Sequence, residues 1–150
     1  MTTQASRRPK GMTVSSFTSV SLTPPLVLVS IAKGTEIHDQ LRAAKTFAVN
    51  FLAHGQESIS NRFAGRTEVR ELFEGLRFKS GVSGSPIIEG VRAVIECKAW
   101  NVYDGGDHSL IIGEVISVKP ISKKKPLIYY EQKYTTTESP EVPKDCADPS

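Results

Sequence analysis

The chain has 150 residues, a formal net charge of +3 at pH 7, two cysteines and three histidines. A chain of this length fits one domain with its own core, and it needs no disulfide framework to fold. No apolar run approaches the roughly 18 residues of a membrane-spanning helix, and the basic start of the chain lacks the apolar core of a signal peptide. We therefore expect no membrane segment and a reducing, cytoplasmic location.

The basic residues gather at two places, Arg7 to Lys10 and Lys119 to Lys125. Aromatic residues do not alternate with them, as a stacking platform for nucleic acid would require. His38, His54 and His108 are far apart and lack the spacing of metal ligands. Neither a nucleic-acid partner nor a metal is expected.

Residues 1–10 show no periodicity, which predicts a loop, a frayed end or a truncated start. From Gly11 to Leu22 the sequence alternates at period two. One face would be core, with Met12, Val14, Val20 and Leu22, and the other would carry Thr13, Ser15, Phe17, Ser19 and Ser21. Such small hydroxyl groups let a flat polar ring approach the backbone. Composition alone favours a plain edge strand with a solvated face.

The apolar run Leu26 to Ile31 predicts a central strand that is buried on both faces. Thr35 is placed to cap a helix over residues 36–45, and the free N–H groups of that helix, beside Lys33, would suit a phosphate. A strand is expected over residues 47–52, followed by a short helix over residues 56–64.

The second half of the chain predicts more strands. Residues 67–90 read as a long loop with one short strand or helix. Residues 92–103 and 108–119 predict two strands joined at Asp104-Gly105-Gly106-Asp107, because Asp-Gly between β-rich runs signals a hairpin. Residues 126–134 predict a closing strand, and residues 135–150 a disordered tail. The fold class is therefore mostly β, an antiparallel barrel with short peripheral helices.

Three motifs point to one family. The segment GMTVSSFTSVSLTPPLV resembles the flavin-binding segment of the flavin reductase family, the split-barrel flavoproteins that supply reduced flavin to two-component monooxygenases. Arg62-Phe63-Ala64 matches a Phe-Ala pair that packs near the cofactor in the family, and Gly106-Asp107-His108 resembles a motif whose histidine lies on the nicotinamide side of the flavin. The resemblance implies an FMN-binding split barrel over residues 11–134, paired as a homodimer.

The resemblance also implies an activity, that of an NAD(P)H:flavin oxidoreductase with FMN or FAD as cofactor and NADH or NADPH as co-substrate. It places the flavin along Thr13, Val14, Ser15, Ser16, Phe17, Thr18, Ser19, Val20 and Ser21, with Lys33, Thr35, Arg62 and Phe63 near its phosphate and ring. His108 would be the catalytic residue, and Tyr129 and Tyr130 would border the nicotinamide. A Gly-x-Gly-x-x-Gly fingerprint is missing, so the nicotinamide would bind weakly in a cleft beside the flavin.

Family members normally begin with a helix and a further strand before the Gly-Met-Thr segment, and a missing strand would leave an unpaired sheet edge. A defective family member is therefore one alternative. The others are an FMN-retaining electron carrier without efficient NAD(P)H turnover, and a non-catalytic barrel that binds an anionic partner through its lysines.

Overall fold

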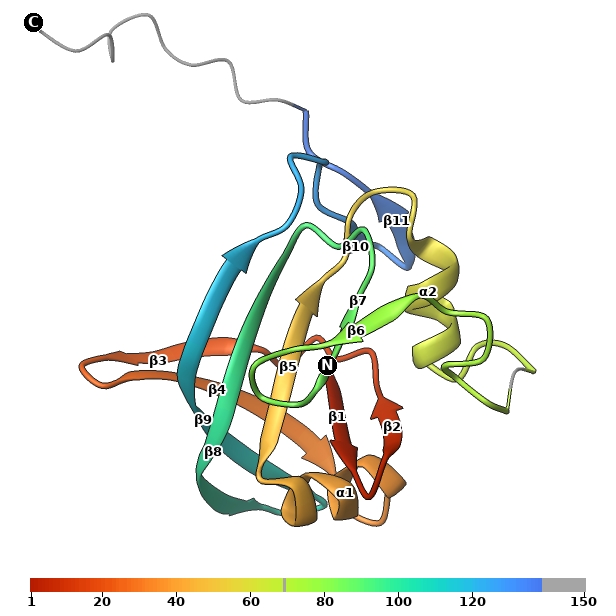
Figure 1. The fold of residues 1–150 in the computed structure, drawn as a ribbon. Helices are drawn as coiled ribbons and strands as arrows, with labels where there is room; N and C mark the ends of the chain where they lie inside the picture. Colours follow the sequence, from red (N-terminus) through yellow and green to blue (C-terminus); the bar gives the residue numbers. More distant parts are fainter. Residues whose placement is uncertain (69, 139–150) are drawn as a thin grey trace, which may run out of the picture.

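The fold is built on one curved antiparallel sheet, seen in a computed structural model that describes residues 1–68 and 70–138. Its strand order is β2-β1-β5-β8-β9-β4-β3 (Figure 1). The bounds of these strands are Thr2–Ala5 (β1), Arg8–Gly11 (β2), Thr18–Leu22 (β3), Pro25–Ala32 (β4), Thr46–Phe51 (β5), Ala93–Gly105 (β8) and His108–Pro120 (β9). The mostly β class predicted from the sequence is confirmed.

Two helices lie outside the sheet, α1 (Glu36–Ala44) at one end of it and α2 (Glu57–Phe63) near the other (Figure 1). Both match the predicted ranges to within one residue at each end. Thr35 precedes α1 as predicted, but its hydroxyl donates to the carbonyl of Ala32 (2.8 Å) and does not cap a helix N–H group. In the part of the chain that the structure describes, neither helix has the length and apolar character to cross a membrane.

The β8–β9 hairpin is the longest pairing in the sheet, and it was predicted correctly. Gly105 pairs with His108, so Gly106 and Asp107 form a two-residue turn. Gly106 has a φ of 78°, a conformation that glycine adopts without strain. This tight turn determines where His108 enters the sheet.

Residues 1–10 are not a loop, so that prediction is wrong. β1 and β2 form a hairpin that joins the sheet where Thr2 pairs with Ala48 of β5. Thr2 and Thr3 are almost fully buried, and their hydroxyls donate to the carbonyls of Pro86 (2.6 Å) and Thr46 (2.7 Å). Sequence periodicity missed this strand because its buried residues are threonines whose polar groups are satisfied by backbone carbonyls.

The segment after Gly11 also differs from its prediction. Residues 12–17 are irregular, and β3 begins only at Thr18, with a bulge between Ser19 and Ser21. Val20 and Leu22 were assigned to the core but are 49% and 89% exposed. Phe17, assigned to the polar face, packs edge-on against Phe51 at 5.4 Å between ring centroids. The irregular backbone and the bulge break the period-two alternation on which the prediction rested.

Strand β4 is not buried on both faces as predicted. Val27, Val29 and Ile31 are buried, whereas Leu26, Leu28 and Ser30 on the other face are half-buried. The buried face joins the main core with Phe47, Cys97 and Ile111.

The predicted closing strand is instead a small hairpin. β10 (Ile128–Tyr130) and β11 (Lys133–Thr135) are joined at Glu131 and Gln132, which both have positive φ angles. Within residues 67–90, β6 (Phe78–Ser80) and β7 (Pro86–Ile88) form another short hairpin. The tail expected over residues 135–150 lies, from residue 139 onward, outside the described residues.

Burial of Cys97 gives the first testable prediction. Its side chain is fully buried, and this burial raises the pKa of the thiol to about 12, with the nearby Glu96 adding to the shift. In a Cys146→Ser variant, we expect iodoacetamide at pH 8 to leave Cys97 unmodified in the native state and to label it completely in denaturant. Mass spectrometry reads the result, and rapid labelling of the native protein would contradict this placement.

Candidate functional site

The Gly-Met-Thr segment is fixed to the end of α2. The N–H group of Thr13 donates to the carbonyl of Phe63 (2.9 Å), and its hydroxyl donates to the carbonyl of Ser60 (2.7 Å). A Cβ atom on Gly11 would lie 2.5 Å from the ring of Phe63. Only glycine therefore allows this close approach, and two of the motifs found in the sequence are in direct contact.

A second anchor joins the segment to β4. The hydroxyl of Ser16 donates to the carbonyl of Ser30 (2.9 Å) and accepts from the N–H group of Ser30 (3.0 Å). The side chain thus takes the place of a strand backbone over one residue. The hydroxyl of Ser16 is thereby used in holding the segment to β4, whereas the side chain of the neighbouring Ser15 is exposed.

The anchored segment and the Gly-Asp-His motif meet in a cleft of about 230 Å³, which we call the histidine-side cleft. Its lining residues are Met12, Thr13, Val14, Ser15, Ser16, Ser30, Ala32 and His108. His108 is brought there by its pairing with Ala32 across β4 and β9. The structure therefore unites two motifs that are more than ninety positions apart in the sequence.

The hydrogen bond between His108 and Asp107 determines which ring nitrogen carries the proton. His108 Nδ1 lies 2.7 Å from Asp107 Oδ1, and this contact lowers the pKa of the Asp107 carboxyl group. An ionised carboxylate has no hydrogen to donate, so Nδ1 must be the donor. In the neutral ring, Nε2 is then a hydrogen-bond acceptor that is available to a ligand.

Lys33 stabilises the turn that carries His108. Its ammonium group contacts the carboxylate of Asp104 and the carbonyl of Gly106 (2.6 Å). Its backbone N–H group donates to the carbonyl of Asp107 (2.9 Å). The hydrogen bond that Lys33 donates to Asp104, together with its positive charge, lowers the pKa of the Asp104 carboxyl group. From the sequence, Lys33 was predicted to lie near a phosphate; in the structure its ammonium group contacts the β8–β9 turn.

His38 is a site residue that the sequence analysis missed. It is buried on α1, and its Nε2 lies 2.9 Å from the hydroxyl of Ser109, the residue after His108. The only sequence signal is its position beside Ile37 and Leu41 on the buried side of the helix. His38 thus supports the start of β9 through Ser109, in a cleft that Lys33 also lines.

A second cleft, of about 320 Å³, lies beside the same segment and is lined by Thr13, Ser15, Phe63 and Tyr129 among others. Tyr134 also lines this cleft and donates its hydroxyl to Asn61 Oδ1 (2.8 Å) on α2. The ring of Tyr129 packs against Tyr134 at 5.1 Å, and the guanidinium of Arg66 lies 4.9 Å from its centroid. We call this the tyrosine-side cleft.

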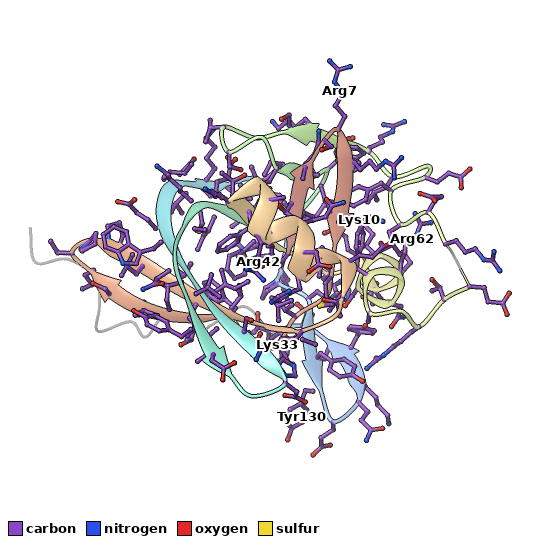
Figure 2. All side chains as sticks on the ribbon, turned by 90° about the horizontal axis from the view of Figure 1, so that it is seen from below. Arg7, Lys10, Lys33, Arg42, Arg62 and Tyr130 are labelled. Atoms are coloured by element: carbon purple, nitrogen blue, oxygen red, sulfur yellow. The ribbon has the colours of Figure 1, made fainter. Side chains whose placement is uncertain are left out.

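Several predicted site residues lie elsewhere. Tyr130 is 64% exposed on the outer side of the β10–β11 hairpin (Figure 2). Arg62 donates to the carbonyls of Glu74 (3.0 Å) and Leu72 (3.4 Å), so it holds the loop after α2. Residues 18–21 belong to β3, the strand at one edge of the sheet (Figure 1). Thr35 and Lys33 line different clefts.

Comparison with known proteins gives a consistent result. Residues 1–138 match the model of the flavin reductase like domain. The chain is 45% identical over 112 residues to an NADH-dependent FAD reductase of Streptomyces globisporus, a match that covers 73% of this chain and 62% of that protein. It is 38% identical over 132 residues to the reductase subunit HsaB of a flavin-dependent monooxygenase from Mycobacterium tuberculosis, with coverages of 87% and 70%.

A solved structure agrees with these matches. The NADH:FAD oxidoreductase of Streptomyces globisporus, in complex with NAD and FAD fragments, superposes with a TM-score of 0.83 at 36% identity. The match covers 95% of this chain and 84% of that one. The chain spans less than two thirds of the first relative's length.

The contact between Gly11 and Phe63 can be tested by substitution. Gly11→Ala should lower the free energy of unfolding by about 1–3 kcal/mol, because the new methyl group overlaps the Phe63 ring. Adding Phe63→Leu should recover part of the loss, which urea unfolding of both single variants and the double variant will measure. Strictly additive losses would show that the two residues do not meet.

Proposed function

The chain belongs to the flavin reductase family, and from this premise we propose that it is an NAD(P)H:flavin oxidoreductase. The observation that carries the proposal is the histidine-side cleft, where the Gly-Met-Thr segment and His108 line one space. When bound there, a flavin, FMN or FAD, would supply the hydride-accepting chemistry. The protein's own part is to bind, orient and exclude water.

The donor set of the cleft fits a flavin ring. Residues 13–16 offer small side chains and an irregular backbone whose groups are not all paired within a sheet. The exposed hydroxyl of Ser15 can donate to or accept from the polar edge of the ring. On the other side of the segment, Phe63 and Tyr129 supply apolar surface. The ring would thus lie along Thr13 to Ser16, with the rest of the predicted segment flanking it.

His108 would position the nicotinamide. The neutral imidazole presents Nε2 as an acceptor, and the carboxamide of NADH or NADPH has an N–H group to donate. A neutral acceptor orients that group without adding a charge near the hydride. Tyr129, which lines the neighbouring cleft, is better placed for a second contact than the exposed Tyr130.

Reduced flavin would leave the protein for a partner, and a flavin-dependent monooxygenase is the proposed acceptor, in the reducing cytoplasm where NAD(P)H is available. The reductase subunit HsaB, to which the chain is similar, is the support for this assignment. An electron carrier that retains its flavin is the second candidate.

The role of His108 can be tested directly. His108→Ala should raise the KM for NADH about three- to tenfold, the cost of one hydrogen bond between neutral groups, with little change in flavin affinity. The measurement is anaerobic reduction of the flavin band in stopped flow over a range of NADH concentrations. His54→Ala, at an exposed histidine after β5, is the matched control. An unchanged KM in His108→Ala would contradict the assignment, and failure of the parent chain to bind any flavin would overturn the function itself.

We also propose that the protein acts as a homodimer. Exposed large apolar side chains are concentrated on the β3–β4 and β8–β9 hairpins, namely Val20, Leu22, Trp100, Val102, Ile116 and Val118. Monomeric proteins rarely leave so many such groups in water on neighbouring elements. Association with a second copy through these hairpins would remove them from solvent.

The dimer has its own test. Light scattering coupled to size-exclusion chromatography should give twice the chain mass of 16.4 kDa for the parent protein. Val118→Glu, a charge at a 61% exposed position of β9, should shift it toward the monomer because a carboxylate would be buried in the interface. Val82→Glu, at a 64% exposed position outside these hairpins, should leave the mass unchanged. A monomeric parent would refute the proposal.

A further inference from the structure

A third cleft, of about 720 Å³, opens beside the flavin segment, and we call it the basic cleft. Its walls are the β1–β2 hairpin, the start of α1 and the loop that follows α2: residues 7–12, 35–37 and 70–73. Met12 lines the basic cleft and also lines both the histidine-side and the tyrosine-side clefts. The basic cleft therefore adjoins the segment over residues 13–16 at Met12.

The charge of the basic cleft is positive. Arg7, Arg8, Lys10 and Arg70 face two carboxylates, Glu36 and Glu71, so its formal charge is +2, from four cations and two anions. Lys10 pairs with Glu36 at 2.6 Å, and the charges of Lys10 and Arg8 together lower the pKa of Glu36. Lys10 therefore lies at the first turn of α1, as Figure 2 also shows, and Arg8 lines the same cleft. Within the described residues, the three arginines form no ion pair.

The same cleft has an apolar wall. Ile37, Leu72 and Phe73 line it, and the Phe73 ring is held edge-on between Phe63 (5.1 Å) and Phe78 (5.0 Å). A fixed aromatic wall opposite planar guanidinium groups suits a flat heterocycle, which arginine can also stack upon. The volume falls within the range of roughly 300–1,000 Å³ typical of small-molecule sites.

We propose that the basic cleft binds the adenosine and pyrophosphate end of FAD, so that the protein selects FAD over FMN. The inference rests on the proposed function, in which the flavin ring lies along residues 13–16. Arg8 and Lys10 bind the pyrophosphate beside Thr35, and the wall of Leu72 and Phe73 receives the adenine. In this arrangement Lys10 takes the role that the sequence analysis gave to Lys33.

A pyrophosphate and an adenine also occur in NADH and NADPH, but position favours the flavin. The basic cleft adjoins the flavin segment at Gly11 and Met12, whereas the turn that carries His108 is braced by Lys33 at a different cleft. The nicotinamide ring is proposed to bind at His108. Its dinucleotide tail would then have to pass over the flavin to reach Arg8 and Lys10.

The experiment is a set of binding titrations with riboflavin, FMN, FAD and ADP, followed by calorimetry at fixed ionic strength, so that the readout does not depend on turnover. For the parent chain we expect FAD to bind at least about tenfold more tightly than FMN, and ADP to compete with FAD but not with riboflavin. Lys10→Gln combined with Arg8→Gln should weaken FAD binding about tenfold or more and leave riboflavin binding unchanged. Arg42→Gln, on the last turn of α1 and outside this cleft, is the matched control.

A variant with the opposite expected effect guards against a simple loss of folding. Glu36→Gln removes a carboxylate that competes with the ligand for Lys10, so it should tighten FAD binding about threefold or more. Equal affinities for FMN and FAD, or variants that weaken riboflavin and FAD alike, would overturn the inference. A rise in the KM for NADH without a change in FAD affinity would assign the cleft to the nicotinamide dinucleotide and also overturn it. Absence of binding by every flavin, riboflavin included, would instead refute the proposed function.

Discussion

The contact of Gly11 with the Phe63 ring is the constraint on which the rest of the site depends. It brings the backbone after β2 so close to α2 that Thr13 can bond with its N–H group and its hydroxyl to two carbonyls of that helix. With the segment held at this end, Ser16 fixes its other end to Ser30 of β4. The residues between these anchors cannot join a regular strand. Their irregular course is what exposes Ser15 and opens clefts on both sides of the segment.

The position of His108 depends on contacts that hold the β8–β9 turn. The β8–β9 turn has two residues, and its exposed tip would move freely without further contacts. Lys33, the residue after β4, supplies them with its ammonium and backbone N–H groups, and His38 supplies a buried hydrogen bond to Ser109 from α1. The residues on both sides of His108 are thus held by Lys33 and His38, while Asp107 determines the tautomer of His108. Positioning by neighbours of this kind is what a site for ring-to-ring hydride transfer needs, because the chemistry itself belongs to the cofactors.

The sequence revealed the elements whose patterns are local. Asp-Gly between β-rich runs predicts the β8–β9 hairpin, and the stripe of Ile37 and Leu41 predicts α1. It could not reveal β1, because Thr2 and Thr3 look like surface residues until the carbonyls of Pro86 and Thr46 are known to receive their hydroxyls. Val20 and Leu22 were misplaced for the reverse reason. Their alternation was genuine, but the bulge in β3 and the irregular backbone before it turned them to solvent.

The different partners of Lys10 and Lys33 show why the sequence alone could not identify the residues of the site. Lys33 precedes α1 in the sequence, and Lys10 contacts its first turn in space. A positive charge at the start of this helix would suit a phosphate. Sequence distance favours Lys33, which is two positions from Thr35. Yet the tight turn of β8–β9 places Asp104 and the Gly106 carbonyl within reach of Lys33, so the charge of Lys33 is paired there.

Lys10 lies on the β1–β2 hairpin, which the sequence did not predict, and its ammonium group contacts Glu36 at the first turn of α1. Glu36 and Asp104 are equally exposed, and surface ion pairs of this kind contribute little, so either carboxylate could be exchanged for a phosphate at small cost. The difference is that Lys33 also donates to the Gly106 carbonyl, whereas Lys10 bonds only to Glu36 within the described residues. This difference is why we propose Lys10 in the basic cleft as the phosphate-binding cation, with Lys33 holding the turn that carries His108.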